Sequence, residues 1–354
     1  MTREDTKITQ DFPGWPVVLS QLFRGEDLSF DLSRLALIQI LSGDTPMAHA
    51  AAFVAALRTK GESVSEVSGM ASAMLEFATK VDVDPYLVDT CGTGGDRSMT
   101  INVSTMAALI VAGAGVKVCK HGGRASSSKS GSADVLESLG VKVDIGPSLV
   151  AECIAKANIG FCFAPKFHPA MANVASLRRE LGVPTVFNFL GPLVNPARAK
   201  YQVVGVSDPA MAETMVGVLA NQGSERAMVV YGEDGLDEIS TTAVSCVLEL
   251  SRDKDGQPVI RRYKIDPADL GIALAGLDDL RGGEASENAV IVREVLQGSP
   301  GPKADIAILN AGAALYICGA ASSIGDGIGI ARQSIASGAA LRALEGLISS
   351  SQGH

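Results

Sequence analysis

The sequence lacks an excess of positive charge, and this shortage limits the partners that it can have. It contains 30 Lys and Arg residues against 39 Asp and Glu residues, which gives a net charge of −9 and a pI of about 5.1. A protein that binds nucleic acid usually carries a basic face that matches the phosphate backbone. The charge balance therefore argues against a nucleic-acid binder and favours small-molecule partners.

Paired cysteine spacings and long apolar runs are also lacking. None of the six cysteines forms a C-x-x-C pair and most lie in apolar surroundings, which indicates buried free thiols in a reducing compartment. The longest apolar run, Met106 to Val116, is far shorter than the roughly 20 residues that cross a bilayer. The first ten residues, MTREDTKITQ, are charged and polar, so no secretory signal is expected. We therefore expect a cytoplasmic protein that does not span a membrane.

Glycine, by contrast, is abundant and often follows an apolar segment. The 38 glycines are typical of a chain with many βα and αβ turns. Apolar residues recur at helical spacing up to about residue 80, Gly43 and Gly61 stand at natural helix ends, and no strand pattern appears before Pro85. The sequence therefore predicts a small helical domain over residues 11–83.

From Tyr86 onward, strand patterns alternate with helical patterns. YLVDT, VKVCK, FCFAP, YQVVGV and RAMVVYG resemble strands, and apolar helical segments separate most of them. This alternation predicts an α/β fold in which residues 84–350 form a large domain with a mostly parallel central sheet flanked by helices. Residues 169–191 interrupt the pattern with a helix and a turn-rich run, and we expect this segment to return to the helical domain.

Two glycine-rich loops lie at the predicted carboxyl ends of the first two strands. The first, GTGGD from Gly92 to Asp96, can converge backbone N–H groups on an anion, and a helix that begins near Ser104 adds its positive end. The loop matches neither a Walker loop nor G-x-G-x-x-G, so nucleoside triphosphate and nicotinamide sites are not predicted. Read alone, it is equally compatible with an ordinary βα turn.

The second loop is more specific for phosphate. It joins Lys120, His121 and Arg124 to the hydroxyl run from Ser126 to Ser128. Lys and Arg form charge-assisted hydrogen bonds with phosphate, and serine hydroxyls add neutral donors. A solvated basic loop is the less favoured interpretation, because structural loops rarely combine these groups. Carboxyl ends of parallel strands are where such ligands bind.

Four further residues are candidates on weaker grounds. Asp237 and Glu238 form an adjacent acidic pair that could hold Mg²⁺ together with substrate phosphates, although solvated turn carboxylates are commoner. Arg178 could bind a carboxylate in bidentate fashion, but composition alone favours a residue on a solvated helix face. His168 could likewise be a packing or capping residue.

These motifs together resemble the anthranilate phosphoribosyltransferase family of tryptophan biosynthesis. The similarity covers nearly the whole chain and includes GTGGD, NVST, KHGGRASSSKSGSADVLESLGV, RRELGVPTVFNFLGPLVNPAR, DGLDEIS and the C-terminal ENA…LNAGAALY. It implies a helical domain, an α/β domain and a homodimer formed through the helical part. It also implies transfer of phosphoribosyl from 5-phosphoribosyl 1-pyrophosphate to the amino group of anthranilate, with Mg²⁺.

The resemblance also implies roles for individual residues. Those that would bind phosphoribosyl pyrophosphate are Gly92, Gly95, Asp96, Thr100, Asn102, Val103, Ser104, Thr105, Lys120, His121, Gly122, Gly123, Arg124, Ala125, Ser126, Ser127, Ser128 and Ser132. Those that would bind Mg²⁺ are Ser104, Asp237 and Glu238. Those near anthranilate would be Gly92, Gly123, His168 and Arg178.

Two positions depart from the family pattern. Gly123 stands where the family usually has an asparagine that contacts anthranilate, and Arg97 stands where it usually has glycine. We expect an active enzyme with a modestly altered acceptor site. Two alternatives remain open at this point, namely a pyrimidine-nucleoside phosphorylase-like enzyme and a non-catalytic paralogue that binds nucleic acid.

Overall fold

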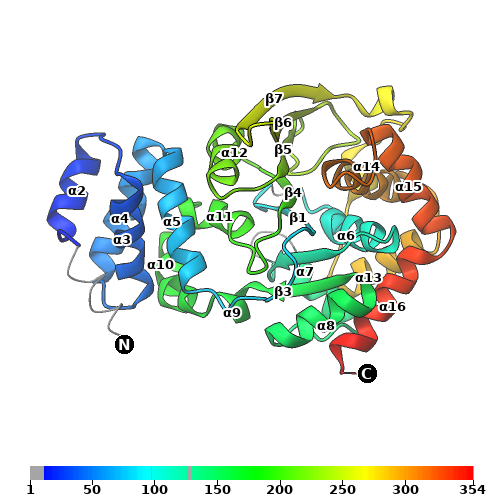
Figure 1. Ribbon diagram of the computed structural model, residues 1–354, viewed down its shortest axis with the longest axis horizontal. Helices are drawn as coiled ribbons and strands as arrows, with labels where there is room; N and C mark the ends of the chain where they lie inside the picture. Colours follow the sequence, from blue (N-terminus) through cyan, green and yellow to red (C-terminus); the bar gives the residue numbers. More distant parts are fainter. Residues whose placement is uncertain (1–11, 97, 126–128, 354) are drawn as a thin grey trace.

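The amino-terminal part of the protein is a helical layer beside a larger α/β layer. The computed structural model describes residues 12–96, 98–125 and 129–353. Ser29 and Ser63 cap two of the first helices with their side chains, and Gly43 and Gly61 follow two of them with positive φ. The four helices at the left of Figure 1 are α2 (Trp15–Phe23), α3 (Phe30–Leu41), α4 (Met47–Lys60) and α5 (Val64–Glu76).

A seven-stranded sheet forms the centre of the larger layer. Its order is β3-β2-β1-β4-β5-β6-β7, and the first five strands in this order are parallel. The parallel strands are almost wholly buried, as expected of a sheet covered on both faces. They are β1 (Val88–Gly92), β2 (Val118–Gly122), β3 (Ile159–Phe163), β4 (Tyr201–Gly205) and β5 (Arg226–Gly232). This architecture confirms the predicted fold class.

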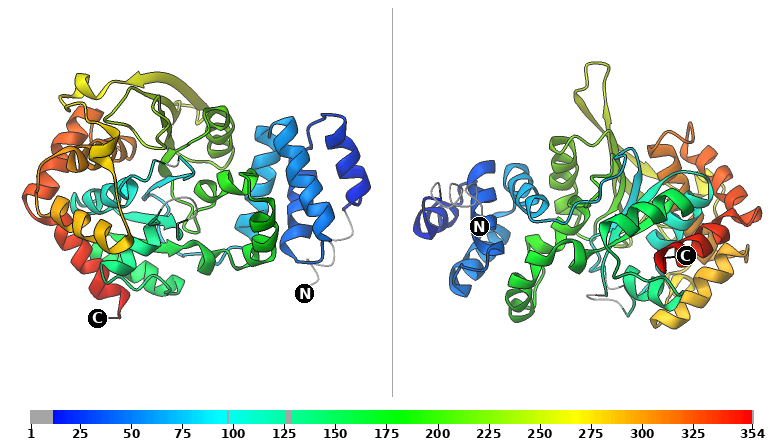
Figure 2. Two further views of the ribbon diagram at one scale, coloured as in Figure 1. Left: turned by 180° about the vertical axis from the view of Figure 1, so that it is seen from behind. Right: turned by 60° about the horizontal axis from the view of Figure 1, so that its bottom comes forward.

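The last two strands, β6 (Ser245–Arg252) and β7 (Pro258–Ile265), pair in antiparallel fashion and were not predicted from the sequence. Strand β7 is mostly exposed, because it forms the edge of the sheet and carries Arg261, Arg262 and Lys264. Charged residues on an edge strand discourage pairing with other chains, and they also disguise the strand pattern. Figure 2 shows the β6–β7 hairpin extending beyond the rest of the fold.

Helices cover both faces of the sheet and divide the core in two. Helix α12 (Ala212–Asn221) packs on the face of the sheet that is turned toward the helical layer, and it contacts α5 of that layer. The 3-10 turns η3 (Pro209–Met211), η4 (Pro267–Leu270) and η5 (Leu277–Leu280) lie in connections. The other face is covered by α6 (Val103–Gly113), α7 (Ser132–Ser138), α8 (Pro147–Ala157), α13 (Ala285–Leu296), α14 (Pro302–Ile317), α15 (Ile324–Ala336) and α16 (Ala339–Ser351).

The segment after β3 leaves the sheet and packs against the helical layer. Turn η1 (Pro169–Val174) contacts α3, and α10 (Ala175–Leu181) contacts α4. The predicted single helix over this stretch is in fact a 3-10 turn followed by an α-helix. The predicted turn-rich run contains the short helix α11 (Val186–Leu190) and the 3-10 turn η2 (Gly191–Leu193). A further short helix, α9 (Ala164–Phe167), directly follows β3 and begins the segment.

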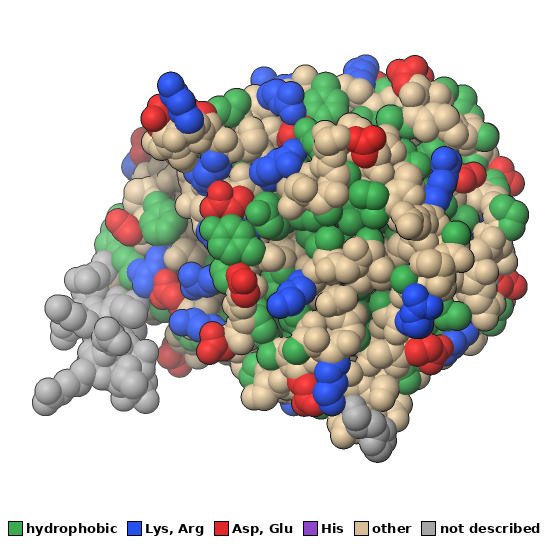
Figure 3. Space-filling model, turned by 45° about the vertical axis from the view of Figure 1, so that its right-hand side comes forward, with side chains coloured by type: hydrophobic (Ala, Val, Ile, Leu, Met, Phe, Trp, Pro, Cys, Tyr) green, Lys and Arg blue, Asp and Glu red, His purple; other side chains and the backbone are tan. Residues whose placement is uncertain are grey.

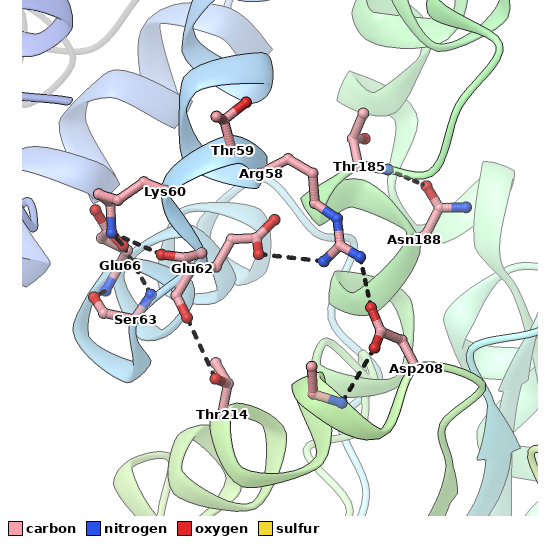
Figure 4. A network of polar contacts seen from close by, with 12 residues as sticks. Arg58, Thr59, Lys60, Glu62, Ser63, Glu66, Thr185, Asn188, Asp208 and Thr214 are labelled. Atoms are coloured by element: carbon pink, nitrogen blue, oxygen red, sulfur yellow. Dashed lines mark hydrogen bonds and ion pairs between the residues drawn. The ribbon is translucent and has the colours of Figure 1, made fainter. Parts of the chain in front are cut away.

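Polar contacts join the helical layer to the α/β layer (Figure 4). Arg58 at the end of α4 donates to the Asp208 carboxylate at 2.5 Å, and its guanidinium lies 5.5 Å from the centre of the Phe189 ring. The Thr214 hydroxyl on α12 donates to the backbone carbonyl of Glu62 at 3.3 Å. The two layers are therefore fastened by side chains as well as by a shared apolar core.

Surface and cysteine properties agree with the composition. Acidic and basic side chains are interspersed over the face in Figure 3, with hydrophobic side chains between them. All six cysteines are free, and four of them are buried, as predicted. Within the described ranges, none of the helices is both long and apolar enough to cross a bilayer.

Candidate active site

The candidate site lies where the carboxyl ends of the parallel strands meet. The chain runs outward from β1 to β3 and then returns to β4 on the other side of β1, so the crossover direction changes between β1 and β4. Ligands of open α/β sheets bind at such a switch point. A cavity of about 280 Å³ opens there, and both predicted glycine loops line it.

Neighbouring strands hold the first glycine loop in place. The Thr93 N–H donates to the Gly205 carbonyl at 2.9 Å, which continues the β1–β4 pairing beyond the sheet. The Ser207 hydroxyl donates to the Gly94 carbonyl at 2.8 Å, and the Ser207 N–H donates to the Thr93 hydroxyl at 3.1 Å. Because Gly94 and Gly95 have positive φ, this turn favours glycine at both positions.

Two other glycines give the acidic pair room to approach the loop. A Cβ atom on Gly92 would lie 2.3 Å from Asp237 Oδ2, and one on Gly205 would lie 1.5 Å from the Asp237 carbonyl oxygen. The Gly94 N–H donates to the same Asp237 oxygen at 2.7 Å. The glycines at the ends of β1 and β4 therefore set the position of Asp237 against the loop.

Burial makes both carboxylates of the acidic pair costly to ionise. Asp237 is 8% exposed, and burial together with nearby Asp96 raises its pKa to about 6. The pKa of Glu238 is also raised, by burial first and then by the charge of Asp237. Two adjacent carboxylates in this state would be stabilised in their ionised form by a bound cation.

Lys120 supplies the positive charge beside this pair. Its ammonium group is buried and donates to the Thr90 carbonyl at 2.5 Å and to the Ser104 hydroxyl at 3.1 Å. The positive charge of Lys120 partly offsets the rise in the pKa of Glu238, because it attracts the ionised carboxylate. Ser104 lies in the first turn of α6, where helix N–H groups also favour an anion.

Asp89 and Asn195 support the end of β2. Buried Asp89 accepts a hydrogen bond from the His121 N–H at 3.2 Å and one from the Asn195 side-chain amide at 2.8 Å. The Asn195 amide also donates to the Cys119 carbonyl at 2.8 Å. This pair fixes the backbone on both sides of Lys120, and neither residue was identified as functional from the sequence.

His121 and His168 form a buried pair behind the second loop. Their ring centres lie 5.0 Å apart, and His121 Nδ1 lies 3.1 Å from the Gly191 carbonyl oxygen. Burial lowers the pKa of His121 to about 3 and that of His168 to about 4. Both rings are therefore neutral at physiological pH and do not contribute cations to a phosphate site.

The second glycine loop is anchored mainly by α7. Arg124 pairs with Asp134 at 2.8 Å and with Glu137 at 2.6 Å, and its guanidinium lies over the Phe163 ring. The Ser132 hydroxyl donates to the Gly123 carbonyl at 3.3 Å. Arg124 lines the cavity, but its charge is shared with two carboxylates.

The structure brings most of the predicted site residues to one cavity. The predicted residues that line it are Gly92, Gly95, Asp96, Thr100, Asn102, Val103, Ser104, Thr105, Lys120, His121, Gly122, Gly123, Arg124, Ala125, Ser132, Asp237 and Glu238. Ser126, Ser127, Ser128 and Arg97 lie outside the described residues.

Two predicted acceptor residues lie away from the lining of this cavity. His168 is buried behind His121, and Arg178 lies on α10 at the helical layer. Burial lowers the pKa of Arg178, and among the described residues no carboxylate forms an ion pair with it. The guanidinium thus remains available to a carboxylate ligand.

The donor set fits a hard divalent cation only in part. No group of three or more His, Cys, Asp or Glu side chains in the described part of the chain could hold a metal ion. Asp237, Glu238 and the Ser104 hydroxyl supply oxygen ligands, but fewer than a complete shell. Mg²⁺ commonly takes one or two carboxylates and completes its shell with water and phosphate oxygens, so these residues fit Mg²⁺ bound with a phosphate ligand.

Known proteins resemble the chain over nearly its full length. Residues 84–341 match the glycosyl transferase family α/β domain, and residues 16–78 match the helical bundle domain of that family. An anthranilate phosphoribosyltransferase of Nocardioides sp. is 50% identical over 94% of this chain and 97% of the relative. The Rhodococcus jostii enzyme of the same name is 48% identical over 92% of this chain and 90% of the relative.

Solved structures agree with these sequence relatives. The anthranilate phosphoribosyltransferase of Thermus thermophilus has a TM-score of 0.87 and 40% identity, covering 95% of this chain and 99% of that one. The Saccharomyces cerevisiae enzyme in complex with PRPP and Mg also has a TM-score of 0.87, with 30% identity over 96% of this chain and 98% of that one. A second structure of the yeast enzyme contains 4-fluoroanthranilate.

Proposed function

The chain belongs to the anthranilate phosphoribosyltransferase family, and on this premise we propose that it transfers phosphoribosyl from 5-phosphoribosyl 1-pyrophosphate to the amino group of anthranilate. The products are N-(5-phosphoribosyl)anthranilate and pyrophosphate, and the reaction serves tryptophan biosynthesis. One observation carries the proposal. Two glycine loops, buried Lys120 and the buried Asp237–Glu238 pair line one cavity at the switch point of the sheet.

The donor occupies this cavity in our proposal. Backbone N–H groups of the first loop and of the α6 amino terminus bind its pyrophosphate, and Lys120 adds charge. Mg²⁺, when bound at Ser104, Asp237 and Glu238, offsets negative charge on the leaving pyrophosphate. The raised pKa values of the two carboxylates support this role, because a cation would relieve the cost of their ionisation.

The acceptor approaches from the side of the helical layer. Gly92 and Gly123 line the cavity, and His168 lies behind it. Arg178 has no acidic partner among the residues described, so its guanidinium can receive the anthranilate carboxylate in bidentate fashion.

The reaction requires little acid–base chemistry from the protein. The aromatic amine of anthranilate is neutral at pH 7, and the neutral rings of His121 and His168 place no competing charge nearby. Lys120 and the loop N–H groups stabilise charge on the leaving group as the C1–O bond breaks. The proposed mechanism is therefore positioning combined with electrostatic stabilisation.

An anthranilate fluorescence assay tests the proposed function. The purified protein is mixed with Mg²⁺, phosphoribosyl pyrophosphate and anthranilate, and loss of anthranilate fluorescence is followed. We expect a loss that requires all three components and disappears in Asp237→Asn. Bound donor without fluorescence loss would overturn the proposal, and phosphorolysis of thymidine or uridine instead would assign the chain to the phosphorylase alternative.

We also propose that the protein is a homodimer formed through the helical layer. Apolar side chains are exposed there at Val17 (51%), Phe23 (69%), Phe30 (41%) and Met47 (42%). Large exposed apolar side chains that gather on neighbouring helices are typical of an association surface. A second copy of the same surface would cover them in a two-fold arrangement.

A further inference from the structure

The C-terminal motif ENA…LNAGAALY contains two asparagines that have no role in the proposed reaction. Asn288 lies on α13 and Asn310 on α14, and each side chain is 2% exposed. A buried amide is costly unless its donors and acceptor are paired. The partners of the two side chains therefore show what each residue is for.

Asn310 pairs with the loop that carries the acidic pair. Its Oδ1 accepts from the Ile239 N–H at 3.0 Å, and its Nδ2 donates to the Ile239 carbonyl at 2.9 Å. The same Nδ2 also donates to the Ile306 carbonyl on its own helix at 2.9 Å. Asn310 thus holds both backbone groups of the residue directly after Glu238.

The other side of this loop is held by Asp234. Its carboxylate accepts from the Ser240 hydroxyl at 2.6 Å and from the Leu236 N–H at 3.2 Å. Asp237 and Glu238 therefore lie on a short segment fastened at both ends. The end after Glu238 is held by Asn310 at Ile239 and, one residue further on, by the Ser240 N–H, which donates to the Ser245 hydroxyl at 2.8 Å. Asn310 is the contact at this end that comes from a helix distant in the sequence.

Asn288 makes the corresponding contact with the phosphate loops. Its Nδ2 donates to Asn102 Oδ1 at 2.9 Å, and its Oδ1 accepts from the Gly283 N–H at 2.8 Å. Asn102 in turn donates to the Ser130 carbonyl at 3.0 Å. Asn288 thereby orients the residue that bridges the first loop to the second.

We propose that Asn310 and Asn288 are positioning residues for two different parts of the site: Asn310 fixes the metal-binding carboxylates, and Asn288 fixes the phosphate-binding loops. This inference rests on the proposed function, because it assigns the carboxylates to Mg²⁺ and the loops to phosphoribosyl pyrophosphate. If both asparagines served only the stability of the core, their loss would affect every property of the site alike.

The test compares Asn310→Leu with Asn288→Leu, and Ser334→Ala serves as the control. The Ser334 hydroxyl is buried and donates to the Ile110 carbonyl at 2.8 Å, away from the loops. Two measurements need no catalysis: hydrogen exchange at the Ile239 amide in metal-free protein, and Mn²⁺ binding in the presence of pyrophosphate, followed by electron paramagnetic resonance. The KM for phosphoribosyl pyrophosphate is measured at saturating Mg²⁺.

We expect Asn310→Leu to accelerate exchange at Ile239 about tenfold. We expect it to weaken Mn²⁺ binding about 10- to 100-fold, the usual effect of losing a group that orients a metal ligand. Asn288→Leu should instead raise the KM for phosphoribosyl pyrophosphate and leave exchange at Ile239 unchanged. Ser334→Ala should lower the unfolding temperature without either change.

Parallel losses of Mn²⁺ affinity and donor affinity in both asparagine variants would overturn the assignment, as would unchanged Mn²⁺ binding in Asn310→Leu. If that variant does not fold, Asn310→Asp decides the matter, since it keeps the acceptor for the Ile239 N–H and loses the donor to its carbonyl. A wild-type protein that binds Mn²⁺ with pyrophosphate but does not consume anthranilate would refute the proposed function alone.

Discussion

Among single residues, Gly123 is the position where the sequence resemblance led us to expect an altered acceptor site. A Cβ atom there would meet only Ala164 Cβ, at 3.9 Å, so the backbone leaves room for a side chain. Gly123→Asn should lower the KM for anthranilate about fivefold, which corresponds to one added hydrogen bond. Steady-state kinetics with varied anthranilate measure the change, and an unchanged or raised KM would contradict it.

The neighbouring glycine provides a matched control for this substitution. A Cβ atom on Gly122 would lie 2.2 Å from Ser132 Oγ, so this position has no space for a side chain. Gly122→Ala should displace Ser132 and raise the KM for phosphoribosyl pyrophosphate. Similar kinetics in the two variants would mean that the loop responds to any side chain and not to the asparagine amide.

The buried pair of His121 and His168 should make the protein sensitive to acid. The pKa of His168 is lowered from 6.5 to about 4, so the pair stabilises the fold above pH 6.5 and loses this contribution as the pH falls toward 4. His168→Gln should reduce the loss of unfolding free energy between pH 7 and pH 4 by about 3 kcal/mol. Urea unfolding of both proteins between pH 7 and pH 4 measures this difference in unfolding free energy. An identical pH dependence in the wild type and the variant would refute the lowered pKa of His168.

At the scale of elements, close packing joins the end of β4 to the acidic loop. A Cβ atom on Gly205 would overlap the Asp237 carbonyl oxygen at 1.5 Å, and neither the strand nor the loop can move freely. Gly205→Ala should therefore destabilise the protein by about 3 kcal/mol, as strong overpacking does. Chemical denaturation of the wild type and the variant measures this change in the free energy of unfolding.

A glycine in open space is the appropriate control for that measurement. Gly329 lies within α15, and an added Cβ there meets no atom within 4 Å. Gly329→Ala should stabilise the protein by about 0.5–1 kcal/mol through helix propensity. If the two substitutions had the same effect, packing against Asp237 would not be the cause.

At the scale of the whole molecule, the pair of Arg58 and Asp208 links the helical layer to the phosphate loop. Asp208 directly follows Ser207, which holds Thr93 and Gly94. The pair is partly exposed, so its coupling energy in a double-mutant cycle should be only about 0.5–1 kcal/mol. Its loss should nevertheless raise the KM for phosphoribosyl pyrophosphate, because the loop loses one tether to the helical layer.

The measurement combines Arg58→Ala, Asp208→Ala and the double variant, with kinetics and unfolding for each. Arg24 and Glu26 form a solvent-exposed pair within the helical layer, so Glu26→Ala is a matched control without effect on the loop. A coupling energy of zero together with an unchanged KM would show that the contact in Figure 4 is incidental.

Two copies of the protein should associate through their helical layers. Phe23→Glu places a charge at the most exposed of the four apolar positions, and a buried unpaired charge opposes association. The wild type should elute as a dimer, and the variant as a monomer, in size-exclusion chromatography with light scattering. A wild-type monomer would refute the proposed dimer, and a dimeric variant would place the interface elsewhere.

The local features of this protein could be predicted from contiguous stretches of its sequence. Some features are contiguous motifs whose chemistry is visible in a few residues. They are the glycine loops after apolar strands, the Lys120 segment and the Asp237–Glu238 pair. Alternating strand and helix patterns were sufficient for the fold class. Strand β7 was not predicted, because charges on the exposed edge of the sheet obscure its apolar pattern. Strand β6 is interior and mostly buried, so edge charges do not explain why it was missed.

The contacts that hold these parts together form only in the folded chain. Ser207, Asn195, Asn288 and Asn310 are isolated polar residues in the sequence, and each becomes significant through a hydrogen bond to a segment that is distant along the chain. The neutral state of His168 and the raised pKa of Asp237 likewise depend on burial. Local sequence specifies which groups are present, but burial and long-range pairing exist only once the chain has folded.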